Sequence, residues 1–115
     1  MYTPDYWLIL KILGKDPHYK VFGSWSGSYL CGQSWRMNSG IESVTEHLGW
    51  YDIIGSSGSV YRCNDTRYGA NSYGSDVVTD FVNRANGKIE ILETMPDMLN
   101  MNWILSITKE NTNES

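Results

Sequence analysis

The stretch YWLILKIL, residues 6–13, decides the expected fold. Turn-forming clusters bound it on both sides, Pro4-Asp5 before it and residues 14–17 (GKDP) after it, as is typical of a β-strand. Alternate residues of a strand point to opposite faces, and here both faces are mostly apolar, with Lys11 as the exception. A strand that is apolar on both faces is usually covered on both, so we expect this one at the centre of the fold.

Other stretches also alternate between turn clusters and are predicted to be strands: residues 18–25, 34–41, 50–55, 59–63 and 88–94. The first of these follows residues 6–13 after a short turn, so the two are expected to pair as an antiparallel hairpin. A Gly-containing loop predicts a second hairpin from residues 50–55 and 59–63. Residues 88–94 are expected to have one solvent-exposed face or to lie at a sheet edge. Residues 41–45 either continue the third strand or begin a new one.

One stretch has a helical period. Between residues 75 and 86, apolar side chains recur on one helix face: Val77, Val78, Phe81, Val82 and Ala85. Ser75 is predicted to cap the start of this helix, and Gly87 is a common stop signal.

These elements predict an α+β fold. We expect a mainly antiparallel meander sheet of roughly five to six strands, with one amphipathic helix over about residues 75–86 packed on it. Residues 1–108 are expected to form a single globular domain, and residues 109–115 a polar, frayed tail. The pattern after residue 95 leaves two possibilities open, a short helix that begins at Pro96-Asp97 or a last strand over residues 103–107.

Charge and composition argue against several partners. The formal net charge is −4 and the isoelectric point is about 5.0, whereas proteins that bind nucleic-acid phosphates or anionic membranes are usually basic. We therefore expect no nucleic acid and no membrane as partner. Residues 1–14 lack the basic region of a secretory signal, so a cytoplasmic protein is expected. In that compartment Cys31 and Cys63 are predicted to be free thiols that are not joined to each other.

No recognised catalytic or metal-binding motif occurs. There is no phosphate-binding loop, and the cysteines and histidines lack metal-ligand spacing, so no metal, cofactor or catalytic residue is assigned. A nucleophile such as Cys31 beside His18 or His47 would be needed for hydrolysis, but no nucleophile motif surrounds it. A small hydrolase-type enzyme is kept as the alternative function.

The candidate binding surface lies in GSWSGSYLCGQSWRMNSGI, residues 23–41. Trp25 and Trp35 could form an aromatic platform for a ligand, and the alternative is that both are core residues. Arg36 suits recognition of carboxylate or phosphate, and Asn38 can both donate and accept hydrogen bonds. Both alternate away from Trp35. The residues that could flank them on a later strand are Tyr61 and Arg62.

Arg36 has a second interpretation, in which it pairs with an acid such as Asp52 and ties two strands together. The two interpretations make opposite predictions for its replacement, because only the structural pair would lower stability strongly.

Several of these stretches resemble one family as a set: DYWLILKI, HYKVFGSWSGSYL, SWRMNSGI and GSSGSVYRC, followed by a Tyr-Gly pair. The chain is similar over about residues 4–99 to small uncharacterised proteins of marine bacteriophages, especially cyanophages, and of ocean metagenomes. This resemblance implies a phage accessory protein acting in the cytoplasm of an infected bacterium. It implies no activity and no site residues.

The expected function is therefore non-enzymatic binding of a host protein or a small signalling molecule, with a minor virion component as a further alternative. Aromatic side chains are abundant, at 13% of residues, and charged ones are few, at 19%. Because such a surface favours association, we also expect a homodimer.

Overall fold

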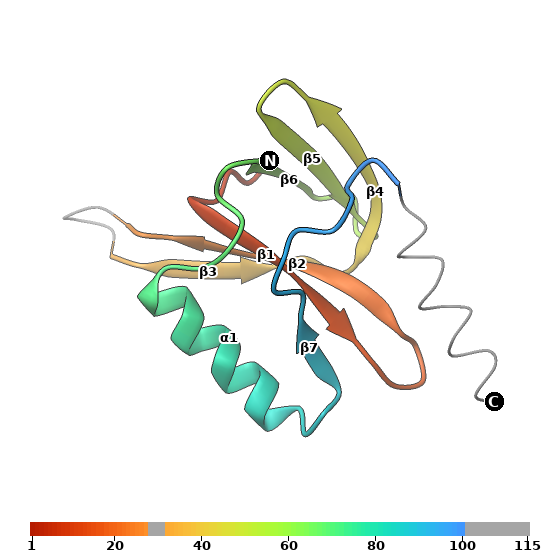
Figure 1. The fold of residues 1–115 in the computed structure, drawn as a ribbon, viewed down its shortest axis with the longest axis vertical. Coiled ribbons are helices and arrows are strands. Elements are labelled where there is room, and N and C mark those ends of the chain that lie inside the picture. Colours follow the sequence, from red (N-terminus) through yellow and green to blue (C-terminus); the bar gives the residue numbers. More distant parts are fainter. Residues whose placement is uncertain (28–31, 101–115) are drawn as a thin grey trace.

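The computed structural model describes residues 1–27 and 32–100. They form three layers: helix α1 (Ser72–Arg84), a four-stranded sheet and a three-stranded sheet (Figure 1). The strands are β1 (Tyr6–Ile12), β2 (His18–Trp25), β3 (Ser34–Met37), β4 (Ile41–His47), β5 (Trp50–Gly55), β6 (Val60–Asn64) and β7 (Ile89–Ile91). An α+β fold built mainly from antiparallel strands is therefore confirmed. None of the described helices has the length and apolar character needed to cross a membrane.

The prediction of one meander sheet is wrong, because the strands divide into two sheets with the orders β3-β2-β1-β7 and β4-β5-β6. The division occurs at Asn38, directly after β3. The Asn38 side-chain oxygen accepts the N–H of Val21 at 2.8 Å, where a backbone carbonyl would continue the ladder with β2. The backbone then leaves β2, and residues 41–47 pair with β5 instead. Residues 41–45 therefore begin a new strand.

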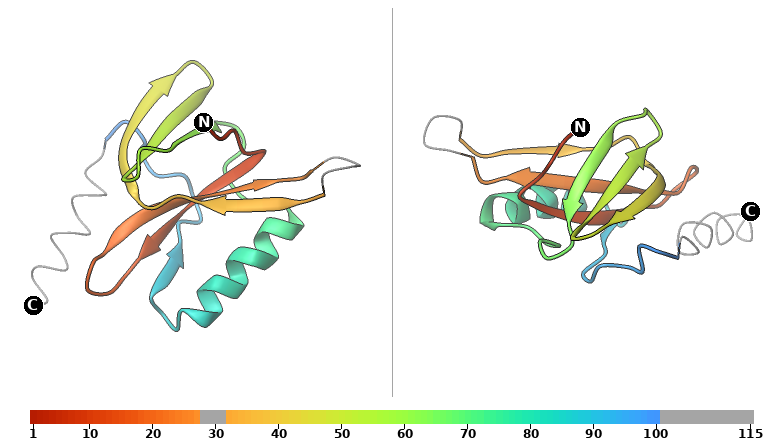
Figure 2. Two further views of the ribbon diagram at one scale, coloured as in Figure 1. Left: turned by 180° about the vertical axis from the view of Figure 1, so that it is seen from behind. Right: turned by 90° about the horizontal axis from the view of Figure 1, so that it is seen from above.

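Strand β1 is central and buried on both faces, as predicted from its sequence. It pairs with β2 on one side and β7 on the other. Trp7 and Ile9 belong to the core between the two sheets, while Leu8 and Leu10 belong to the core beneath α1. Seen from behind, the four-stranded sheet lies between the helix and the β4–β6 layer (Figure 2). One strand thus supplies both cores.

Helix α1 forms where a helix is predicted but begins earlier, at Ser72, so the assignment of Ser75 as cap is wrong. Asn71 is the cap, and its side-chain oxygen accepts the N–H of Gly74 at 2.7 Å. Gly74 lies against β2, where a Cβ atom would come within 2.9 Å of the Ser24 hydroxyl oxygen. The helix approaches the sheet closely at this glycine. The helical period of the apolar residues does not predict this contact, because it depends on the tertiary structure.

The two predicted hairpins, β1–β2 and β5–β6, are both present, and β7 lies at a sheet edge. The N-terminal segment adds to the three-stranded sheet beside β6: the Tyr2 N–H donates to the Val60 carbonyl at 2.9 Å, and Tyr2 accepts from the Arg62 N–H at 2.7 Å. Residues 95–100 contain neither helix nor strand, although Met98 is buried. The predicted tail, and the candidate last strand over residues 103–107, lie outside the described residues.

Candidate functional site

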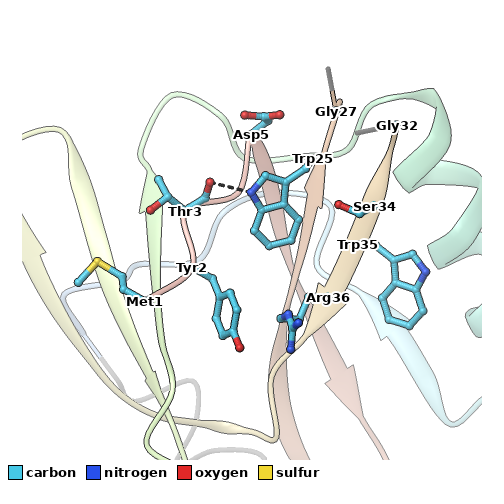
Figure 3. Close-up of a pocket in the computed structure, with 10 residues that line it drawn as sticks. All are labelled: Met1, Tyr2, Thr3, Asp5, Trp25, Gly27, Gly32, Ser34, Trp35 and Arg36. Atoms are coloured by element: carbon cyan, nitrogen blue, oxygen red, sulfur yellow. Dashed lines mark hydrogen bonds between the residues drawn. The ribbon is translucent and has the colours of Figure 1, made fainter. Parts of the chain in front are cut away.

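A pocket of ≈ 590 Å³ lies where the N-terminal segment passes beside the β2–β3 hairpin (Figure 3). The residues that line it combine aromatic rings, hydroxyls, one cation and one anion: Met1, Tyr2, Thr3, Asp5, Trp25, Gly27, Gly32, Ser34, Trp35 and Arg36. Arg36 therefore lies in a concave surface, as expected of a recognition residue. The sequence pattern alone contained no indication that residues 1–5 would form the opposite wall.

Aromatic side chains hold the N-terminal wall in place. The Trp25 indole N–H donates to the Thr3 carbonyl at 3.0 Å, and Tyr2 packs on Tyr61 with ring centres 5.1 Å apart. The Asp5 carboxylate accepts the Ser26 N–H at 2.8 Å. Both pocket walls are thus tied to strands, and a ligand would meet a preformed surface rather than a loose segment.

The Arg36 guanidinium lies over the Tyr2 ring, with its central carbon 4.3 Å from the ring centre. Figure 3 shows Arg36 and Tyr2 facing each other across the pocket. Among the described residues Arg36 forms no ion pair, and its side chain is exposed. A cation stacked on an aromatic ring keeps its outer N–H groups available for an anion.

The alternative interpretation, an Arg36–Asp52 pair, is not realised. Asp52 receives two hydrogen bonds from Arg62, at 2.9 and 3.0 Å. Asp52 lies opposite Arg62 in the β5–β6 register, so the nearest guanidinium is that of the neighbouring strand.

Trp25 and Trp35 do not form a common platform, because they lie on opposite faces of the sheet. The Trp35 ring packs toward the helix, stacked on Phe22 at 5.8 Å and edge-on to Phe81 at 5.1 Å. It remains 39% exposed, so it is a peripheral member of the helix-side core. Both tryptophans line the pocket, but Trp25 shares the sheet face of Arg36 and Trp35 does not (Figure 3).

Asn38 is buried, with 4% of its surface exposed, so the expectation that β3 presents it beside Arg36 is wrong. Its amide oxygen and nitrogen bond the Val21 N–H and, at 3.4 Å, the Gly40 carbonyl. Strand alternation placed it on the Arg36 face but could not show that β3 ends at Met37. The side chain is structural.

Tyr61 and Arg62 were expected to flank Arg36 on an exposed sheet surface. Neither of them does. Tyr61 is 1% exposed and belongs to the core between the sheets. Burial raises the pKa of Tyr61 to about 12, with the nearby Arg36 charge acting in the opposite direction. Arg62 lies on the outer face of the three-stranded sheet and pairs with Asp52. Of the six candidates, Trp25, Trp35 and Arg36 line the pocket, and Asn38, Tyr61 and Arg62 do not.

Sequence reasoning missed Tyr2, Thr3 and Asp5. Their place in the pocket depends on the pairing of Tyr2 with β6, which lies far along the chain. The only available signal was an aromatic residue inside an otherwise polar turn cluster, and such residues are common.

A second polar cluster covers the outer face of β4–β6. The His47 ring stacks on Trp50 with centres 5.2 Å apart, the Arg62 guanidinium lies 4.8 Å from the Trp50 ring centre, and the His47 Nε2 atom is 3.0 Å from the Asp52 carboxylate. Asp52 is the shared partner of His47 and Arg62, whereas the buried Trp50 indole N–H has no hydrogen-bond partner among the described residues. No described contact brings a serine, threonine or cysteine to His47, so the cluster does not support the hydrolase alternative.

The pairing makes stability depend on pH. The Arg62 hydrogen bond holds the pKa of Asp52 below its ordinary value of 3.8, against the opposing effect of burial. The unfolded chain therefore binds this proton at higher pH than the folded one, so the contribution is complete above about pH 4 and is lost as pH falls through the lower folded-state pKa.

We predict that Arg62→Met lowers the melting temperature by a few degrees at pH 7 and that the difference from the unaltered protein shrinks below about pH 3. Thermal melts followed by circular dichroism at pH 7 and at pH 2 measure this difference in melting temperature. Arg84→Met is the matched control, since both side chains of the Arg84–Asp80 pair are exposed to solvent. A difference that is the same at pH 7 and pH 2 would assign the effect of Arg62 to its packing on Trp50.

Neither described histidine nor the described cysteine belongs to a metal-binding group, because residues 1–27 and 32–100 contain no cluster of three or more potential ligands. Cys63 is a free, fully buried thiol, and burial raises its pKa. It is therefore not a thiolate nucleophile near neutral pH. Cys31 lies outside the described residues, so the state of the pair stays a prediction.

The pocket is thus a partly aromatic hollow lined by one guanidinium, that of Arg36. The chain matches no family model, and the comparisons with curated proteins and with solved structures also found no match.

Proposed function

We propose that this protein is a non-enzymatic binding module that holds a carboxylate- or phosphate-bearing ligand in the pocket between Tyr2, Trp25 and Arg36. Consistent with the resemblance to phage proteins, the ligand would be a host protein or small molecule in the cytoplasm of an infected bacterium. We favour a binding role over an enzymatic one because no described contact brings a nucleophile and a base together.

The observation that supports this proposal is the state of Arg36. Its guanidinium is exposed in a concave site, stacked on Tyr2 and without a carboxylate among the described residues. A structural arginine normally bonds an acid or backbone carbonyls, whereas an arginine that recognises an anion keeps its donors free until the ligand arrives. The aromatic rings beside it suit a flat or apolar group attached to the anion.

We predict that phenyl phosphate shifts the Trp25 indole N–H resonance in two-dimensional nuclear magnetic resonance spectra, and that Arg36→Met abolishes the shift. Inorganic phosphate is expected to act more weakly, because it lacks the ring. Arg36→Met is expected to change the free energy of unfolding by less than about 0.5 kcal/mol, since no buried acid loses a partner.

Arg84→Met again serves as the control, because it removes the same charge from a helix surface that is remote in the chain from the pocket residues. It should leave the phenyl phosphate shift intact. If Arg36→Met retains the shift, or if both variants lose it equally, the anion does not bind at this guanidinium and the proposal is wrong.

Self-association is a separate prediction. Met1, Leu48 and Leu99 are exposed by 72%, 95% and 65%, and Trp35 by 39%, so the described surface offers apolar side chains for a second copy. Sedimentation at about 50 µM is expected to show a dimer in equilibrium with the monomer. A single 13.1 kDa species throughout the concentration series would contradict it.

A further inference from the structure

Strand β3 forms an open edge of the four-stranded sheet. It pairs with β2 on one side, with Ser34 opposite Trp25 and Met37 opposite Phe22, and it is the last strand of the order β3-β2-β1-β7. Three of its four residues are exposed and the fourth is half-buried. Within residues 1–27 and 32–100, no strand pairs with its other side.

The backbone groups that this edge leaves unpaired follow from the alternation of an antiparallel ladder. The Asn38 N–H donates to the Val21 carbonyl at 3.1 Å, which makes Val21 and Asn38 a hydrogen-bonded position. Every second residue of β3 repeats that orientation, so Arg36 and Ser34 point their N–H and C=O groups at β2. Trp35 and Met37 then point theirs outward. Four backbone groups, two donors and two acceptors, thus face away from the sheet.

The side chains beside this edge differ between the two faces. Trp35 and Met37 lie on the helix side, where Trp35 contacts Phe22 and Phe81 and Met37 packs on the helix-side core. Arg36 lies on the other face, in the pocket and over Tyr2. An added strand would therefore meet an apolar, a cationic and again an apolar neighbour in succession.

We propose that the ligand is an extended peptide segment that adds to the sheet along β3, with an acidic side chain opposite Arg36 and apolar side chains opposite Trp35 and Met37. This inference rests on the proposed function and names the source of its anion. Strand addition is a recurrent mode of peptide recognition, in which backbone bonds provide affinity and alternate side chains provide selectivity.

Antiparallel pairing fixes the local geometry. Trp35 and Met37 would each exchange both backbone hydrogen bonds with the peptide residue opposite, and Arg36 would face the residue between them. At such a non-hydrogen-bonded position the Cα atoms lie only about 4.5 Å apart. Opposite charges attract there and like charges repel. The expected motif is apolar–acidic–apolar, with β-branched apolar residues because these favour strands.

The probe is the synthetic peptide acetyl-Thr-Val-Glu-Val-Thr-amide, titrated into the full chain by isothermal calorimetry and nuclear magnetic resonance. Replacing its glutamate with lysine should weaken binding at least tenfold, and so should Arg36→Met in the protein. N-methylation tests the backbone. A methyl group on either valine nitrogen removes a hydrogen bond to β3 and should weaken binding at least tenfold. A methyl group on the glutamate nitrogen, which faces away from β3, is the matched control and should leave affinity within about twofold.

The outcomes separate this inference from the proposed function. If all three N-methyl peptides bind alike while Arg36→Met abolishes binding, an anion occupies the pocket without strand addition: the proposed function stands and this inference is overturned. Strand addition is likewise overturned if phenyl phosphate binds at Arg36 and the peptide does not bind. If valine N-methylation weakens binding but Arg36→Met does not, strand addition occurs without a preference for an acidic side chain. This outcome overturns the contact inferred between Arg36 and the acid, and it also overturns the proposed function.

A second copy of the chain is the other occupant to be tested. In a two-fold pairing that matched Trp35 with Met37 of the other copy, two Arg36 side chains would lie opposite each other, which disfavours that register. A dimer in sedimentation that the peptide does not dissociate, and in which amide exchange protects Trp35 and Met37, would assign the edge to self-association and overturn the peptide inference.

Discussion

Replacing Trp7 with alanine is expected to lower the free energy of unfolding by about 3–5 kcal/mol, the largest effect we predict for a single change. Trp7 is fully buried between the two sheets, edge-on to Tyr68 with ring centres 4.8 Å apart. Its indole N–H donates to the Asn64 carbonyl at 2.7 Å. Truncation removes the ring, empties the space it fills and removes one of the hydrogen bonds that the Asn64 carbonyl accepts, another coming from the Arg67 N–H at 3.1 Å. Thermal melts should show a midpoint lower by about 15 °C.

Trp25→Ala is the matched control for this change. Trp25 also donates an indole hydrogen bond to a backbone carbonyl, that of Thr3 at 3.0 Å, but it is only half-buried. The two variants thus differ mainly in how much apolar surface the indole buries, and Trp25→Ala should cost about 1–2 kcal/mol. Equal losses in the two variants would mean that the core between the sheets does not centre on Trp7.

The second large effect is expected for Asn38→Ala, at about 2–3 kcal/mol. The side-chain oxygen is the only partner described for the Val21 N–H, and both groups are buried. Without it a donor remains in the interior with no acceptor, and this costs more than the hydrogen bond itself contributes. The melting midpoint should fall by about 10 °C, and hydrogen exchange of the Val21 amide should become faster in the native state.

Asn83→Ala provides the comparison, since Asn83 is exposed on α1 and its loss should change stability by less than about 0.5 kcal/mol. The sequence-based hypothesis that Asn38 contacts a ligand predicts instead that Asn38→Ala leaves stability nearly unchanged. If Asn38→Ala melts with the unaltered protein and the Val21 amide stays protected, the structural role described for Asn38 is wrong.

How far sequence reasoning reached is clearest at β1 and α1. The double-sided apolar pattern of residues 6–13 correctly predicted a central strand, and the helical period correctly predicted α1. Both signals are local, because they record which faces of a single element avoid water. The start of α1 was misplaced, since Asn71 is selected by a cap bond and Gly74 by contact with Ser24.

The candidate site shows the same division. Arg36 was identified from residue type and alternation, and the structure places it in a pocket. Its neighbours were not identified: Tyr2 reaches it by pairing with β6, and Asp52, the acid suggested for it, bonds Arg62 instead. Each of these depends on which segments become neighbours, and no pattern within one segment contains that information.

The sequence by itself therefore determined most elements of this protein: six of the strands, the helix, and that β1 is covered on both faces; it left β4 open. Only the tertiary structure decided how the strands divide into two sheets and which side chains meet. The physical reason is that an apolar period specifies a face to be buried but not the face that buries it. That choice was made by contacts across long sequence separations, such as Val21 with Asn38, 17 residues apart, and Trp7 with Asn64, 57 residues apart.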